Sequence, residues 1–177
     1  MLNSCSHAML AIERVLRTVA AACLLAVMLL VFFDVLARYL FQSPLIVTYE
    51  LVGMYLMPAI FYFALSDTLA DHHHIAVDLL APRIPVPVRR VIEALASGLM
   101  ATIFVWIVWI FAPSALANFR ANAVVMGALE WPTWIPDAIV VIGATTMALR
   151  LYGRAIAHLA SLATGKSLIR LPPSAGY

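Results

Sequence analysis

The sequence predicts an all-α integral membrane protein with four transmembrane helices. Of its 177 residues, 64% are hydrophobic and 11% are charged, whereas soluble domains are about 45–50% apolar and about 25% charged. The mean hydropathy is +0.99, and long uncharged runs separate the charged residues. A soluble domain of this length has too little interior to bury so much apolar surface, so we expect lipid to surround most of the chain.

Four apolar runs are long enough to cross a bilayer core of about 30 Å, which takes roughly 20 helical residues. The expected spans are residues 18–41, 48–69, 94–119 and 133–152. The third run is the clearest, because it carries no charge at all. Residues 161–177 follow the membrane domain and are expected to form a flexible tail.

Residues 1–17 precede the first span, and two interpretations of them stay open. The stretch AMLAIERVLR at residues 8–17 alternates apolar and charged positions with helical spacing, and Glu13 and Arg17 lie four residues apart. Such a pattern favours a short amphipathic helix in the membrane interface. The alternative is that the same residues are the first turns of span one.

The distribution of positive charge predicts the orientation of the four spans. Nine of the 11 Lys and Arg residues fall in the two termini and the connection between spans two and three. The other two, Arg38 and Arg120, flank the remaining connections. Because positively charged loops stay in the cytoplasm, both termini are expected to be cytoplasmic.

Charged residues near the ends of the spans are candidates for contact with protein. Asp34 and Arg38 lie on one helical face, four residues apart. They could form an ion pair at the interface with lipid, but charges at membrane depth usually face protein, and we expect them to fix how span one packs. Glu50 could complement the positive end of helix two; we favour a contact with Arg38 or with a partner protein.

The polar residues do not form a pattern typical of a metal site, a haem site or a catalytic centre. Three consecutive histidines, His72–His74, lie between Asp71 and Asp78, but neighbouring residues on a regular helix or strand cannot all converge on one ion. Haem in a helical bundle takes its histidine ligands from the bundle interior, and the four spans offer none. We therefore expect no metal, no cofactor and no enzymatic activity. The net charge of +2 gives no reason to expect nucleic acid binding.

The spans also lack the features of an independent transporter. Secondary transporters usually combine internal repeats, broken helices and polar groups near the membrane midplane, and spans three and four have no charge near their centres. Small residues, which permit close helix packing, recur every four positions at Ala94, Gly98 and Thr102. These observations favour an accessory subunit that docks on a larger membrane protein.

Four segments in order give the chain a resemblance to a known family. They are FFDVLARYLF at residues 32–41, SPLIVTYEL at 43–51, DHHHIAVDLL at 71–80 and ALEWPTWIP at 128–136. Together with four spans and this length, they resemble the small membrane subunit of tripartite ATP-independent periplasmic (TRAP) transporters, the DctQ-like family. The positions that match the family's motifs are Asp34, Arg38, Pro44, Glu50, His74, Asp78, Pro132 and Trp134.

The resemblance implies a system of three proteins in the bacterial inner membrane and periplasm. A periplasmic solute-binding protein captures an organic acid, and a large multi-span subunit transports it using a sodium or proton gradient. The small subunit is expected to brace the large one, to help dock the binding protein and to have no transport site of its own. Two alternatives stay open: a haem- or metal-binding anchor of a redox complex, and a small homo-oligomeric exporter.

Overall fold

Four long helical segments dominate the part of the chain that the structure describes, and they confirm the predicted all-α membrane fold. The computed structural model describes residues 2–42, 46–70, 86–127 and 129–164. Helices long and apolar enough to span a membrane cover Ala11–Phe41, Ile46–Leu65, Arg90–Arg120 and Trp134–Ser161. The elements are α1 (Leu2–Phe41), α2 (Ile46–Leu51), a π-helical segment η1 (Val52–Leu56), α3 (Met57–Ala70), α4 (Val86–Arg120), β1 (Val124–Met126), β2 (Glu130–Pro132) and α5 (Trp134–Thr164).

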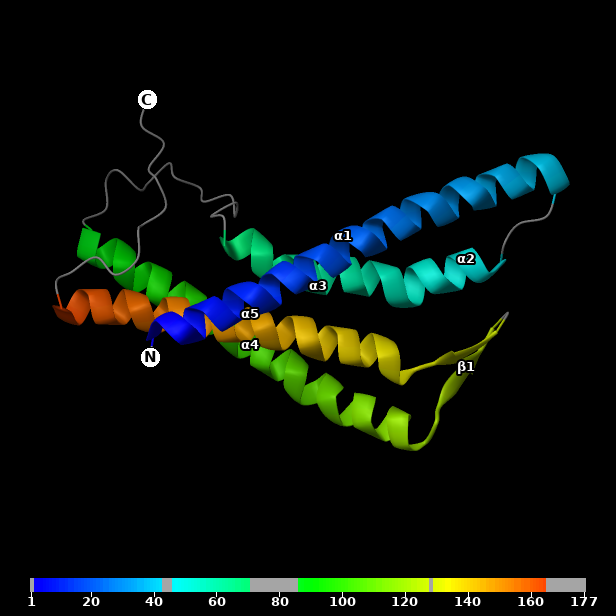
Figure 1. Cartoon of the computed structure of the whole chain (residues 1–177). Helices are drawn as coiled ribbons and strands as arrows, with labels where there is room; N and C mark the ends of the chain where they lie inside the picture. Colours follow the sequence, from blue (N-terminus) through cyan, green and yellow to red (C-terminus); the bar gives the residue numbers. More distant parts are fainter. Residues whose placement is uncertain (1, 43–45, 71–85, 128, 165–177) are drawn as a thin grey trace, which may run out of the picture.

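The helices run lengthwise beside one another (Figure 1). The start of α1, the start of α4 and the end of α5 lie at one end of the bundle, here called the terminal end. The end of α1, the start of α2 and the strands lie at the opposite, hairpin end. The first helix therefore begins, and the last helix ends, on the same side of the bundle, as an even number of spans requires.

Helix α1 is continuous from Leu2 to Phe41, so residues 8–17 are the first part of the helix that contains span one. Within this helix, an uncharged run of residues 18–33 lies between Arg17 and Asp34. Near the terminal end, Glu13, Leu16 and Ala20 are buried. Their spacing places them on one face of α1, toward the bundle.

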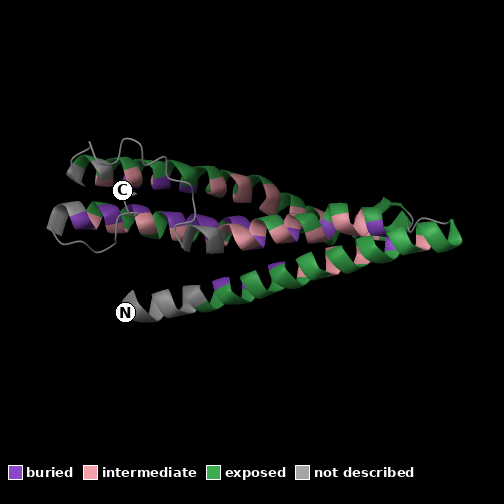
Figure 2. Cartoon of the chain, turned by 90° about the horizontal axis from the view of Figure 1, so that it is seen from above, coloured by how far each residue is buried: buried purple, intermediate pink, exposed green. Residues whose placement is uncertain are grey.

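Two small apolar clusters hold the helices together. One joins α1 and α3 through Leu16, Ala20, Ala59 and Phe63, and the other joins α4 and α5 through Ala101, Met147 and Leu151. Figure 2 shows that the buried positions line the inner faces while exposed positions cover the outer ones. Many large apolar side chains are exposed, which is expected of helices that face lipid.

Helices α3 and α5 approach closely at Gly143. A Cβ atom at this position would lie 2.6 Å from the Tyr62 Cβ and 2.7 Å from the Tyr62 carbonyl oxygen. Any side chain here would collide with the backbone of α3. Glycine is therefore required for this helix contact.

Strands β1 and β2 form an antiparallel hairpin between α4 and α5. Val124 pairs with Pro132 and Met126 with Glu130. Asn122, with a φ of 46°, follows the end of α4 in the left-handed conformation common after a helix. The sequence predicts only a loop here. The available hairpin signal was two adjacent valines with Gly127 two residues after them, and three-residue strands are too short to show an alternating pattern.

Candidate functional site

A hydrogen bond between Glu50 and Trp131 joins α2 to the β-hairpin. The Trp131 Nε1–H donates to Glu50 Oε2 at 2.5 Å. Gly127, between the two strands, lies directly against the Glu50 carboxylate, and a Cβ there would overlap it. The local structure therefore fixes the hairpin on span two. In this contact the partner of Glu50 is a tryptophan of the same chain, and Arg38 pairs with Asp34. The expected contact of Glu50 with Arg38 or with a partner protein stays a prediction.

Tyr55 makes a second connection between span two and the hairpin. Its hydroxyl donates to the Pro132 carbonyl at 2.8 Å, and its ring lies 5.4 Å from the Trp131 ring, centre to centre. Tyr55 lies in η1, where the Met57 N–H donates to the Val52 carbonyl five residues earlier. Such an extra residue in a turn rotates the following side chains relative to a regular α-helix, and π-helical turns often occur at functional sites.

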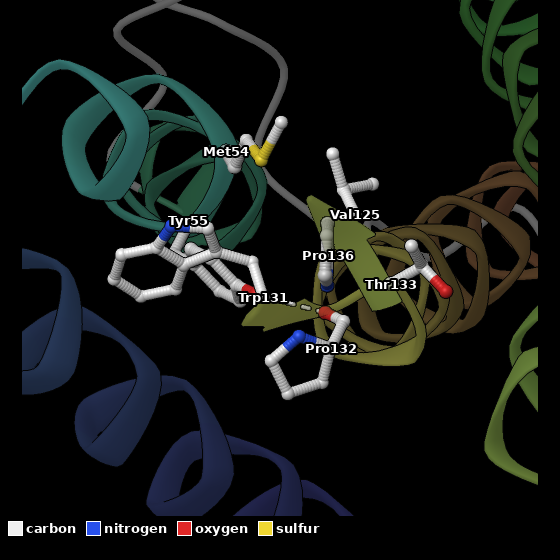
Figure 3. A pocket seen from close by; sticks show the side chains of 7 residues that line it. All are labelled: Met54, Tyr55, Val125, Trp131, Pro132, Thr133 and Pro136. Carbon is white, nitrogen blue, oxygen red and sulfur yellow. Dashed lines mark hydrogen bonds between the residues drawn. The ribbon is translucent and has the colours of Figure 1, made fainter. Parts of the chain in front are cut away.

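A small apolar pocket lies beside these contacts (Figure 3). Its volume is about 180 Å³. Figure 3 shows the rings of Tyr55 and Trp131 lying against each other at its edge. The pocket is lined by Met54, Tyr55, Val125, Trp131, Pro132, Thr133 and Pro136. It has the size of one apolar side chain and offers no charged group, so it suits packing better than catalysis.

The start of α5 is tied to the end of α4 by a polar contact. Asp137 Oδ2 accepts hydrogen bonds from Ser114 Oγ at 2.8 Å and Asn118 Nδ2 at 3.0 Å. The rings of Phe119 and Trp134 pack edge to face, 5.3 Å apart. Asp137 also lies in the first turn of α5, where a negative charge complements the helix dipole.

Asp34 and Arg38 form the ion pair that their spacing predicts. Asp34 Oδ2 accepts from Arg38 Nε at 3.0 Å and from Nη2 at 2.9 Å. The Asp34 side chain is 12% exposed, whereas that of Arg38 is 61% exposed. The pair therefore holds the Arg38 side chain in place at the hairpin end while most of its surface stays exposed to a possible ligand or partner.

The terminal end contains polar contacts that the sequence did not predict. Glu13 of α1 pairs with Arg150 of α5, and Arg90 Nη1 donates to the Ser161 carbonyl at 3.1 Å, which joins α4 to α5. His158 is 1% exposed. The helical spacing of Arg150, His158 and Ser161 was the available signal, since it places all three on one face of α5.

The remaining predicted positions lie elsewhere. Pro44, His74 and Asp78 fall outside the described residues, as do residues 71–85 as a whole and the tail from residue 165. Within residues 2–42, 46–70, 86–127 and 129–164, no group of three or more His, Cys, Asp or Glu side chains could hold a metal ion.

The small residues predicted to pack span three are only partly on its buried face. Ala94 is buried, but a Cβ at Gly98 would meet nothing within 4 Å. Thr102 is exposed, and its hydroxyl bonds the Gly98 carbonyl of its own helix. The small buried residues of α4 are instead Ala94, Ser97 and Ala101.

Comparison with known proteins gives one match. The sequence model of the family described as "Tripartite ATP-independent periplasmic transporters, DctQ component" matches residues 27–161. No curated protein and no solved structure matches the chain. The matched range begins within α1 and ends within α5, so it includes the hairpin and most of the four-helix unit.

Proposed function

We propose, because the chain belongs to the DctQ component family of tripartite ATP-independent periplasmic transporters, that this small transporter subunit braces the large membrane subunit and helps to dock the periplasmic solute-binding protein. The observation that carries the proposal is the family match over residues 27–161, which coincides with four membrane-spanning helices. The protein is a multi-pass component of the inner membrane. The positive charges at the terminal end favour its placement in the cytoplasm.

The bracing role is supported by the large apolar surface that α1 leaves exposed. Only 11% of the most apolar stretch of α1 is buried inside the chain. Large side chains such as Met28 and Phe32 are exposed, at 63% and 60%. In a membrane, apolar exposure alone does not drive association, so close packing and a few polar contacts must hold a partner. The Asp34–Arg38 pair supplies such a contact on the same helix.

The docking role is supported by the surface at the hairpin end. Tyr39, Tyr49 and Met126 are 85%, 87% and 87% exposed there. The Glu50–Trp131 hydrogen bond holds the hairpin against α2 before any partner arrives. A surface that is ordered in advance loses less entropy on binding, which suits recognition of a soluble protein by an otherwise lipid-embedded subunit.

Transport of an organic acid by symport with sodium or protons is assigned to the complete transporter, and this chain supports it without a transport site. The test is uptake by proteoliposomes that contain the large subunit, with its solute-binding protein added outside, in the presence or absence of this chain. We expect uptake to require this chain and to be absent when this chain is reconstituted alone. Uptake by this chain alone would contradict the proposal.

A further inference from the structure

We propose that the terminal ends of α4 and α5 form a binding site for the phosphate of an anionic phospholipid headgroup. The site consists of Arg90 on α4 and Arg154 on α5, whose charges both act on His158. It is separate from the hairpin end and does not depend on the role in bracing or docking.

The position of the site along the bundle matches the headgroup layer. Arg90 lies four residues before the uncharged run of residues 94–119, and Arg154 lies two residues after the predicted fourth span ends at residue 152. The hydrogen bond from Arg90 Nη1 to the Ser161 carbonyl joins the two helices beyond these runs. A group bound at Arg90 therefore lies where the apolar spans end, which is the depth of lipid phosphates.

The geometry of the two helices brings the cationic groups together. Arg154, His158 and Ser161 recur at helical spacing, so they share one face of α5. The charges that act on His158 are those of Glu93, Arg154 and Arg90. Glu93 lies one turn after Arg90 on α4, so the same faces of the two helices meet around the histidine.

The charge balance of this region favours an anion. Among the described residues, the charges that act on His158 are two guanidinium groups, Arg90 and Arg154, and one carboxylate, Glu93. A guanidinium carries five N–H donors, and the contact with Ser161 uses one donor of Arg90. Arg90 is half-buried, so its remaining edge can reach a ligand at the membrane surface. Arginine donors fit phosphate oxygens in pairs.

His158 gives a second indication of a polar ligand. Its side chain is buried, and its Nε2 atom has no hydrogen-bond partner in the part of the chain that the structure describes. Buried polar atoms are nearly always paired with protein or ordered water. A phosphate held by the arginines, directly or through a water, offers the oxygen that this nitrogen lacks.

A lipid fits this chemistry better than free phosphate, because the site lies between two helices at the edge of the apolar spans. Basic pockets in this position are known to bind anionic lipid headgroups. Inorganic phosphate shares the same chemistry, and so does an acidic side chain of a partner protein. The experiment below distinguishes the three sources.

The test is native mass spectrometry of the full chain purified with defined lipids. We expect wild-type protein to retain phosphatidylglycerol or cardiolipin about tenfold more than phosphatidylcholine, since each pair of charge-assisted hydrogen bonds is worth this order of magnitude. Arg90→Gln should abolish this preference. Arg120→Gln, which removes an exposed arginine at the other end of the same helix, should leave it intact.

Arg154→Gln provides a second test in case Arg90→Gln does not fold, and melting in phosphatidylcholine nanodiscs checks the fold of each variant. An equal preference for anionic lipid in the Arg90 and Arg120 variants would overturn the proposal. So would stabilisation of the chain by inorganic phosphate to the same extent as by phosphatidylglycerol. The proposal would also be overturned if the chain retained no anionic lipid alone and Arg90→Gln weakened only its binding to the large subunit. That result would identify an acidic side chain of the partner as the ligand.

Discussion

Glu13 of α1 and Arg150 of α5 form a buried ion pair that joins the first and last helices of the bundle. The two side chains are 4% and 18% exposed. Removal of water from a buried pair offsets much of its attraction, so the net stabilisation by the pair is small. Loss of one partner is costly, however, because the buried charge that remains loses the opposite charge beside it.

Glu13→Gln is therefore expected to lower the free energy of unfolding by about 3 kcal/mol, the lower part of the range for a broken buried pair. The measurement is reversible unfolding in mixed detergent micelles, followed by circular dichroism. Arg14→Gln is the matched control, because Arg14 is the neighbouring residue and is exposed. Equal stability of the two variants would show that the pair does not hold α1 to the bundle.

Gly143→Ala is expected to destabilise the contact between α3 and α5. The added methyl group would lie 2.6 Å from the Tyr62 Cβ, against backbone that cannot move independently. Overpacking of this kind costs about 1–3 kcal/mol, which should appear as a lower melting temperature in detergent. Gly153→Ala on the same helix is the control, because a Cβ there meets nothing within 4 Å. A loss of similar size in both variants would contradict the steric explanation.

Trp131→Phe should release the hairpin from α2 while keeping an aromatic ring in place. The variant removes the Nε1–H donor to Glu50, and a hydrogen bond to a charged group is worth about 1.5–3 kcal/mol. We expect faster amide hydrogen exchange at Val124–Met126 and a several-fold lower affinity for the solute-binding protein. Trp134→Phe is the control. It makes the same change of side chain at a position where the tryptophan ring packs edge to face on Phe119 rather than on the hairpin contact with Glu50. Unchanged exchange in the hairpin would argue against the connection.

The fold could be predicted from the sequence because hydropathy and charge distribution act over whole helices. The Asp34–Arg38 pair could also be predicted, since residues four apart on one helix lie within reach of each other. The contacts of Glu13 with Arg150 and of Glu50 with Trp131 could not be predicted in this way. Glu13 has Arg17 at the same local spacing, but its pairing with Arg150 joins it to a helix whose rotation depends on packing at Gly143.

The hairpin escaped prediction for a related reason. Its strands have three residues each, so an alternating pattern has no room to develop. Its position depends on contacts distant in sequence, such as that of Tyr55 with Pro132. The π-helical turn that aims Tyr55 leaves no pattern of its own in the sequence VGMYL.

Charge reversal at Arg38 tests the association with the large subunit. The Arg38 side chain is 61% exposed while it pairs with Asp34, so its outer side is free to meet a partner in the membrane. Arg38→Glu would place a carboxylate beside Asp34. It would also repel any negatively charged group of the large subunit that binds Arg38. We expect a several-fold lower yield of the large subunit when the two proteins are co-purified through a tag on this chain.

The repulsion from Asp34 could also unfold the chain, so the yield must be compared with the melting temperature of this chain alone. Arg38→Gln removes the charge without adding a like one and should give an intermediate yield with a normal melting temperature. Arg120→Glu reverses an exposed arginine at the end of α4 and should leave the yield unchanged. An unchanged yield with Arg38→Glu would exclude the pair from the subunit interface, and its role would then be limited to the end of α1.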